Sequence, residues 1–288
     1  MLIRASSTRG YSLAQLEHQR RVGDWLYWWE ASEWEKSAWV FRTSKAALIA
    51  VPTGFGPQDD LHIRSDGNAW VRWLAVADSA SETFHLRRVL GLAENKLRAH
   101  GVQHLWVLTT PFSWPSRTLL TALGFSQAEK LITLRKLLFA SSQLPTAWHV
   151  REITPDDIPA LLDLDTQAFN PPWRLGSADL QRLLSRALLA LLVEAEGKVA
   201  GYLCALDQSG GESAHIVRLA VSPAYRRQGI GTALLLEAER LLAQHGAQSV
   251  SLNTMESNQP ARQLYSALGF KPMRTPAWVW RKPLIEQP

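Results

Sequence analysis

The chain has 288 residues, which suits two domains of ordinary size better than one, and its 46% hydrophobic and 20% charged residues are typical of a globular protein. The formal net charge is +5, but the basic doublets are too short and scattered to form a nucleic-acid-binding face, so a nucleic acid is not an expected partner. The single cysteine, Cys204, excludes an internal disulfide and a multi-cysteine metal site, and no apolar run is long enough to span a membrane.

The N-terminal half opens with a tryptophan-rich segment, "WLYWWEASEW". Its residues Trp25, Trp28 and Trp29 have the i, i+3, i+4 spacing of one helix face. This pattern indicates a packing stripe in a core or between domains. A pocket for an aromatic or apolar substrate stays open as the alternative.

The chain then repeats itself. Residues 100–125 ("HGVQHLWVLTTPFSWPSRTLLTALGF") match residues 245–270 ("HGAQSVSLNTMESNQPARQLYSALGF") without a gap, at an offset of 245 − 100 = 145. The same offset aligns the strings "WLAV" and "RLAV". Two long copies indicate two similar domains, which we place at 1–138 and 148–288 with a linker at 139–147.

The second copy shows the elements of such a domain. Alternation predicts strands, and helical spacing after a Thr cap and an early Pro predicts a helix at 154–169. Strands cluster early and alternate with helices later, so we expect a mixed α/β (α+β) domain with one central sheet. The predicted strands are 148–153, 189–196, 199–207, 214–221, 249–255 and a last one near 277–283, and the further helices are 177–188, 231–245 and 259–268.

Between the strand at 214–221 and the next helix lies "YRRQGIGT". A strand that passes through glycines into a helix N-terminus makes an anion site, because free amides and the helix dipole favour negative charge. Gly229 and Gly231 would let a phosphate approach the backbone. A nucleoside-triphosphate loop needs Lys before Thr232, and a dinucleotide fingerprint needs Gly at Leu234, so both are disfavoured. A plain helix-capping turn stays open.

The strings "VRLAVSPAYRRQGIGTALL" and "NQPARQLYSALGF" resemble the GNAT superfamily of acyl-coenzyme A-dependent N-acetyltransferases, from Ala214 to Phe270. Arg226, Gly229 and Gly231 meet its motif Arg/Gln-x-x-Gly-x-Gly/Ala. The resemblance implies two tandem domains, each with a mostly antiparallel sheet, a splayed parallel strand pair and flanking helices. It also implies acetyl-coenzyme A as cosubstrate, with its pyrophosphate on the loop amides and its pantetheine arm along the preceding strand. The implied contacts are Leu219, Ala220, Val221, Arg226, Arg227, Gln228, Gly229, Ile230, Gly231, Thr232 and Asn258.

The closing helix carries two further candidates. Asn258 and Tyr265 are seven residues apart and can share one helix face. By the resemblance, Asn258 binds the pantetheine arm and Tyr265 protonates the departing thiolate, in a direct attack within a ternary complex. The alternatives are a helix cap and a half-buried core phenol.

A general base is less clearly marked. His215 lies where some members of the family carry a glutamate base, and strand alternation places it on the face of Leu219. At roughly 13 Å along the strand it would need a water relay. A solvated histidine at a strand end is the alternative, and Glu256 and Glu212 are weaker candidates. We expect Cys204 to be a buried, inert thiol.

The N-terminal copy lacks the cofactor residues. Shifting the site back by 145 puts Phe84 and Leu86 at the two glycines, which would crowd a pyrophosphate, and Glu82 would repel it. We therefore expect the first domain to keep the fold without the cofactor site. The remaining counterparts are Ser81 for Arg226, Ser113 for Asn258, Leu120 for Tyr265 and Trp70 for His215.

The acceptor is expected to be a primary amine. Ribosomal-protein N-terminal acetyltransferases carry a glutamate base five residues before the asparagine, where this chain has Asn253, so we favour a small-molecule amine over a peptide N-terminus. A non-catalytic acyl-coenzyme A sensor is the rival from another class, and Tyr265 argues against it. We expect a cytoplasmic monomer or homodimer that needs no metal and binds no membrane.

Overall fold

A computed structural model describes residues 2–4, 20–21, 39–43, 46–52, 67–76, 81–110, 115–139 and 147–284. The chain forms two compact units, which we call the N-terminal unit (residues 1–130 and 277–288) and the C-terminal unit (residues 131–276). Trp25, Trp28 and Trp29, Ser113 and most of the linker lie outside the described residues.

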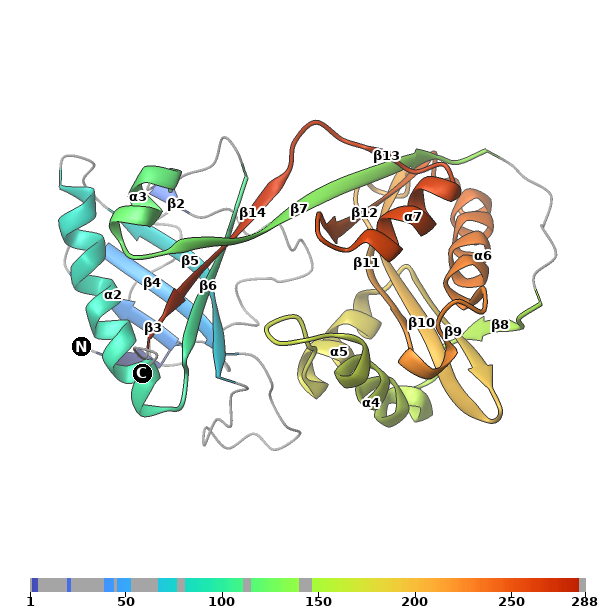
Figure 1. The fold of residues 1–288 in the computed structure, drawn as a ribbon, viewed down its shortest axis with the longest axis horizontal. Coiled ribbons are helices and arrows are strands. Elements are labelled where there is room, and N and C mark those ends of the chain that lie inside the picture. Colours follow the sequence, from blue (N-terminus) through green and yellow to red (C-terminus); the bar gives the residue numbers. More distant parts are fainter. Residues whose placement is uncertain are drawn as a thin grey trace. The chain divides into compact units, whose positions relative to one another are not determined.

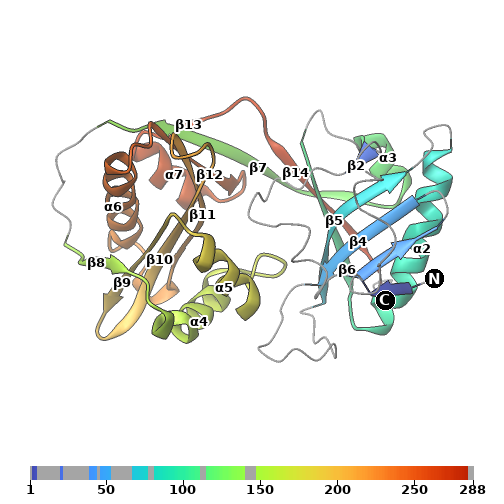
Figure 2. The ribbon, with the colours of Figure 1, turned by 180° about the vertical axis from the view of Figure 1, so that it is seen from behind.

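The N-terminal unit is a mixed sheet with helices (Figures 1 and 2). Its strand order is β1-β3-β4-β5-β6-β14-β7, and β2 pairs with β5. Helix α2 packs on β3, β4 and β5, and β5 and β6 pair in parallel. The strands are β1 (Leu2–Arg4), β2 (Arg20–Arg21), β3 (Trp39–Arg42), β4 (Ala46–Pro52), β5 (Asn68–Val76), β6 (His104–Thr109), β14 (Ala277–Pro283) and the start of β7 (Ser126–Leu137), and the helices are α2 (Glu82–Ala99) and α3 (Arg117–Ala122).

The C-terminal unit repeats this plan. Its strand order is β7-β12-β11-β10-β9-β8, β13 pairs with β7, and among the strands that the structure describes here only β11 and β12 pair in parallel. The predicted mixed α/β fold, with a mostly antiparallel sheet and one parallel pair, is confirmed. The strands are β8 (Val150–Glu152), β9 (Leu189–Ala195), β10 (Lys198–Asp207), β11 (Ser213–Val221), β12 (Ser249–Met255) and β13 (Lys271–Pro272), and the helices are α4 (Ile158–Ala168), α5 (Ser177–Arg186), α6 (Ile230–Gln244) and α7 (Gln259–Ala267), with short 3₁₀ turns at Pro155–Asp157 and Pro223–Tyr225.

Helices cover both faces of the C-terminal sheet. Gly201 and Tyr202 are neighbours on β10, so they face opposite ways. A Cβ on Gly201 would lie 2.7 Å from a side-chain carbon of Ile230 in α6, whereas the Tyr202 hydroxyl bonds Asp165 in α4. Helix α6 therefore packs on one face, and α4 lies on the other.

The two sequence repeats exchange their last strands. β14 comes from the end of the second repeat, yet it pairs with β6 in the N-terminal unit. Residues 131–137 of β7 come from the end of the first repeat, yet they pair with β12 in the C-terminal unit. The bounds of the compact units therefore differ from the sequence ranges 1–138 and 148–288. Each of these two strands forms its main-chain hydrogen bonds with the sheet of the other repeat, and so it belongs to that unit.

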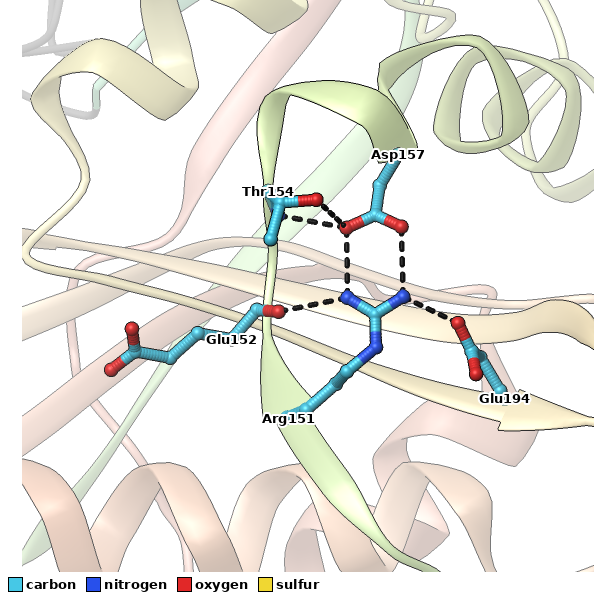
Figure 3. Close-up of polar contacts among 5 residues, drawn as sticks. All are labelled: Arg151, Glu152, Thr154, Asp157 and Glu194. Carbon is cyan, nitrogen blue, oxygen red and sulfur yellow. Dashed lines mark hydrogen bonds and ion pairs between the residues drawn. The ribbon is translucent and has the colours of Figure 1, made fainter.

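The start of α4 is fixed by a charged cluster around Arg151 (Figure 3). The guanidinium of Arg151 donates to both carboxylate oxygens of Asp157, each over 2.8 Å, and also pairs with Glu194 of β9. Asp157 in turn accepts the amide and hydroxyl of Thr154, which closes a capping box. The predicted Thr cap is confirmed, and the cluster ties β8, β9 and α4 together.

Candidate active site

One edge of β11 is open over its C-terminal half. Parallel pairing with β12 stops at Ile216, while pairing with β10 continues to the end of the strand. Main-chain N–H and C=O groups of residues 217–221 on the β12 side therefore have no strand partner within the described part of the chain. The predicted pantetheine contacts, Leu219, Ala220 and Val221, all lie in this open segment.

A β-bulge shifts the side chains of this strand. Arg218 and Ile216 face consecutive residues of β10, so Val217 has no partner of its own. Beyond the bulge the alternation is reversed, and His215 shares its face with Arg218 instead of Leu219. The prediction that His215 and Leu219 share a face is wrong for this reason.

The glycine stretch forms a left-handed turn into α6. Gly229 is the N-cap residue with φ 85°, a conformation that glycine adopts without steric cost. The first bonded amide of the helix is that of Ala233, which donates to the Gly229 carbonyl over 2.9 Å. The amides of Ile230, Gly231 and Thr232 have no acceptor among the described residues, and the first turn carries no acidic side chain. These three N–H groups and the helix dipole can bind a phosphate.

The residues before Gly229 are held by their own neighbours. Arg227 has φ 64°, which is uncommon for a non-glycine residue. Arg226 donates from Nε to the Val221 carbonyl over 3.3 Å, and the Gln228 carbonyl accepts the indole N–H of Trp148 over 2.7 Å. The side chains of Arg226, Arg227 and Gln228 are exposed, so an anion bound at the surface of the turn could contact them.

Helix α7 presents both predicted residues. Tyr265 is 7% exposed, its ring lies edge-on to Phe270, and its hydroxyl bonds no described residue. Burial raises the pKa of Tyr265 to about 12, so the phenol keeps its proton at neutral pH. The Asn258 side-chain oxygen caps α7 by accepting the Ala261 amide over 3.3 Å. The amide nitrogen of Asn258 remains available as a donor.

His215 sits in a polar network inside the C-terminal unit. Thr133 donates to the Asn253 side-chain oxygen over 2.8 Å, which turns the Asn253 amino group toward His215 Nε2 at 3.2 Å. Nε2 is then an acceptor, and Nδ1 carries the proton that Ser251 Oγ accepts over 2.8 Å. The Ser251 hydroxyl in turn donates a hydrogen bond to the side-chain oxygen of Gln208 over 3.1 Å. Both ring nitrogens are occupied, and burial lowers the pKa of His215 to about 4.

Several residues that shape this region were not predicted from the sequence. Gly201 allows α6 to pack closely on β10, and Trp148 holds the glycine turn from outside. Asp165 and Arg218 form a buried ion pair beside the open strand segment. An arginine in the apolar string "HIVRLAV" was the one visible signal for that pair.

Cys204 is fully buried, and burial raises the pKa of its thiol to about 12, so it has no nucleophilic thiolate at neutral pH. No group of three or more His, Cys, Asp or Glu residues able to hold a metal occurs among the described residues. Within the same part of the chain, no helix combines the length and apolar character needed to cross a membrane.

The equivalent place in the N-terminal unit is built differently. Helix α2 begins after Ser81, which has φ −130° and no left-handed turn, and its first turn carries Glu82. Phe84 stands where Gly229 stands in the other copy, and its side chain is 59% exposed. At the position of His215, Trp70 packs against Trp106 with ring centroids 6.1 Å apart.

An open strand edge beside a glycine-initiated helix, in a mixed sheet with one splayed parallel pair, is the arrangement of acyl-coenzyme A-dependent N-acetyltransferases. The sequence profile of the Acetyltransferase (GNAT) family matches residues 158–270. The chain is 32% identical to the [ribosomal protein bS18]-alanine N-acetyltransferase of Escherichia coli (strain K12), over 40% of this chain and 74% of that protein. This chain belongs to the GNAT family and is an acetyl-coenzyme A-dependent N-acetyltransferase.

Three further comparisons extend the similarity. The mycothiol acetyltransferase of Clavibacter sepedonicus is 30% identical over 54% of this chain, which spans only 55% of that protein. A tandem GNAT protein from the clavulanic acid biosynthesis pathway has the same fold with a TM-score of 0.55, over 87% of this chain and 83% of that one at 18% identity. A GCN5-related N-acetyltransferase from Sphaerobacter thermophilus also gives a TM-score of 0.55, at 17% identity, over 83% of this chain and 81% of that one. The tandem arrangement inferred from the repeat agrees with the tandem structure.

Proposed function

We propose that the C-terminal copy transfers an acetyl group from acetyl-coenzyme A to a primary amine of a small molecule, at a single working site. The observation that carries this proposal is that two neighbouring sets of main-chain groups lack hydrogen-bond partners among the described residues. The free amides of Ile230, Gly231 and Thr232 fit a diphosphate, and the open edge of residues 217–221 fits the amide groups of a pantetheine arm.

The residues that would hold the donor follow from this geometry. The loop from Arg226 to Thr232 supplies amides and two cationic side chains to the diphosphate, and the Asn258 amino group can donate to the arm. Acetyl-coenzyme A supplies a thioester whose carbonyl carbon an amine can attack. A main-chain N–H of the open strand, near Leu219 or Ala220, would polarise that carbonyl.

The chemistry needs a neutral amine and a proton for the leaving sulfur. The amine nitrogen bonds to the carbonyl carbon, the carbon–sulfur bond breaks, and the phenol of Tyr265 protonates the sulfur. A buried phenol with a pKa of about 12 is protonated throughout the neutral range and can serve as this donor. Cys204 takes no part, because it lies on β10 and stays a thiol.

The candidates for the base that receives the amine proton are His215, Glu256 and Glu212. The geometry favours a structural role for His215, since Asn253 and Ser251 occupy its two nitrogens. To act as a base, His215 would have to exchange the Asn253 hydrogen bond for one to a water that contacts the amine.

Two observations bear on the acceptor. Asn253 replaces the glutamate expected of a protein N-terminal acetyltransferase, and it is bound between Thr133 and His215. Similarity to a mycothiol acetyltransferase also favours a small molecule. A peptide N-terminus is the second candidate, favoured by the 32% identity to a bS18-alanine N-acetyltransferase.

We propose further that the N-terminal copy binds no cofactor. Its helix α2 has an acidic first turn and Phe84 in place of the glycine turn, so a diphosphate would meet repulsion and a side chain.

A thiol-release assay tests these proposals with acetyl-coenzyme A and a panel of spermidine, glucosamine, an aminoglycoside and a peptide with N-terminal alanine. Turnover with a small amine and not the peptide supports the proposal, and the reverse selects the second candidate. Calorimetry with coenzyme A should give one site per chain. Two sites would refute the inactive N-terminal copy, and none would refute the proposed cofactor site.

A further inference from the structure

A buried ion pair lies directly beside the open strand segment. Asp165 is in the last turn of α4 and is fully buried, and Arg218 follows the bulge of β11 and precedes Leu219. The guanidinium meets the carboxylate in the bidentate way, with Nε 2.7 Å from Oδ2 and Nη2 2.7 Å from Oδ1.

Each partner also binds the segment between α4 and α5, which we call the α4–α5 segment (residues 169–176). The Asp165 carboxylate accepts the Leu175 amide over 2.9 Å. The Arg218 Nη2 donates to the Trp173 carbonyl over 2.8 Å, and the guanidinium carbon lies 3.5 Å from the centre of the Phe169 ring. The segment is thus attached at three points to one ion pair.

Tyr202 completes the cluster from β10. Its fully buried hydroxyl donates to Asp165 Oδ2 over 2.6 Å. With Leu175 and Arg218, this gives the two carboxylate oxygens four donors in all. Every element of the cluster, from α4 through β10 and β11 to the α4–α5 segment, is therefore held by the same carboxylate.

Stability alone does not require such a pair. Well-packed apolar residues of similar volume stabilise an interior as well as a buried ion pair does, because the charges must first be desolvated. What a planar guanidinium adds is fixed geometry, with donors in one plane and a face for an aromatic ring. The N-terminal copy has Trp73 at the position of Arg218, so the repeat whose glycine turn is missing also lacks this arginine.

The cluster lies on the face of the sheet that the proposed donor site does not use. The diphosphate is proposed at the N-terminus of α6, and α6 packs on the Gly201 side of β10. Tyr202 and the ion pair lie on the opposite side, where the α4–α5 segment is attached. If the donor lies as proposed, with its diphosphate on the α6 side, the side of the α4–α5 segment is left for an amine to approach the thioester carbon.

We propose that Asp165 and Arg218 are positioning residues for acetyl transfer: their ion pair holds the α4–α5 segment as a wall of the amine site and fixes β11 next to Leu219. The proposal rests on the proposed function for the position of the donor. Neither side chain is assigned a chemical step.

The decisive variant replaces the pair by apolar residues, Asp165→Leu with Arg218→Met. This change leaves no unpaired buried charge, but the Tyr202 hydroxyl and the Leu175 amide lose their acceptor, so the urea midpoint should be lower than that of the wild type and the kinetics are measured where circular dichroism shows a folded variant. The KM for the best amine of the panel should rise, or kcat should fall, by about tenfold or more, while the dissociation constant of coenzyme A changes less than about twofold. Arg218→Lys should not rescue the amine KM, because a lysine lacks the planar donor pair.

Arg151→Met is the matched control, since Arg151 also binds an aspartate in the bidentate way but lies at β8. It should leave the amine KM and the coenzyme A affinity unchanged. If the apolar double variant keeps the wild-type kcat and amine KM, the positioning role is refuted.

A second measurement does not depend on activity. Hydrogen exchange on the ligand-free protein should show the Leu175 amide exchanging at least about tenfold faster in the double variant than in Arg151→Met. Unchanged exchange overturns the proposal even when acetyl transfer is altered. Absence of coenzyme A binding by the wild type would instead refute the proposed function, and the exchange result would still stand on its own.

Discussion

The indole N–H of Trp148 donates to the main-chain carbonyl of Gln228 over 2.7 Å. This carbonyl would accept the Thr232 amide if α6 began one residue earlier. Trp148 occupies it from outside, and Gly229 turns the chain away at φ 85°. The helix therefore begins with its first amides unpaired, which is what an anion site at this end requires.

Replacing Gly229 by alanine should weaken coenzyme A binding by about tenfold, because a Cβ at this positive φ costs about 1–2 kcal/mol and shifts the amides. Gly246→Ala is the matched control. Gly246 has φ +92°, and a Cβ there would meet no atom within 4 Å, so it carries the same strain at the far end of α6. Calorimetry should show full affinity in the control, and equal losses in both variants would refute the assignment of the turn.

Tyr265→Phe should lower kcat by about a hundredfold while the dissociation constant of coenzyme A is retained, because only the proton donor is removed. Since the pKa of Tyr265 is raised to about 12, its ionisation should add no limb to the rate profile below about pH 11. Tyr225→Phe is the control, as that hydroxyl bonds Glu196 at 3.1 Å. A normal kcat in Tyr265→Phe would refute the role of Tyr265 as proton donor and would leave it only a packing role in the core.

The partly buried His215 should make stability depend on pH. Its pKa falls from 6.5 to about 4 on folding, so the unfolded chain binds an extra proton between these values. Stability is therefore complete above about pH 6.5 and decreases as the pH falls toward 4, by at most about 3 kcal/mol. Urea unfolding at pH 7 and pH 5 measures this loss. His215→Gln should remove most of the difference in the free energy of unfolding between pH 7 and pH 5. If the variant keeps this difference, other titrating groups cause it.

The Arg151 cluster should also make stability depend on pH, but in a lower pH range than His215 does. The guanidinium of Arg151 and the Thr154 amide hold the pKa of Asp157 below its ordinary value of 3.8. The stabilisation is present above that value and is lost as the pH falls through the lowered pKa. Asp157→Asn should lower the free energy of unfolding at pH 7 by about 1 kcal/mol, the usual worth of a helix cap, and acetyl transfer should be unaffected. Equal stability of variant and wild type at pH 7 would contradict the cluster's role.

The strand exchange predicts how fragments fold. Residues 1–138 expressed alone lack β14, whose buried Val279 and Trp280 complete the N-terminal sheet. This fragment should be unfolded or aggregated by circular dichroism and gel filtration. Residues 1–130 joined by a glycine-rich linker to 275–288 should fold, because the missing strand is restored. A folded, monomeric 1–138 fragment would contradict the exchange.

Much of the site could be predicted because its signals are local in the chain. Gly229 and Gly231 act through the backbone conformation of their own positions, and Asn258 and Tyr265 are related by helical spacing alone. The repeat offset of 145 likewise needs only comparison along the sequence. From such local relations the sequence alone determined the tandem mixed α/β fold, the glycine turn and the helix that carries the phenol.

Other features depend on pairing between distant segments, and only the tertiary structure decided them. The bulge at Val217 arises from the register of β11 against β10, and it reversed the expected face of His215. The exchange of β7 and β14 depends on which sheet edge accepts each strand. Asp165 and Arg218 are far apart in the chain, and burial brings them together because a carboxylate and a guanidinium enter an apolar interior at least cost when each satisfies the other.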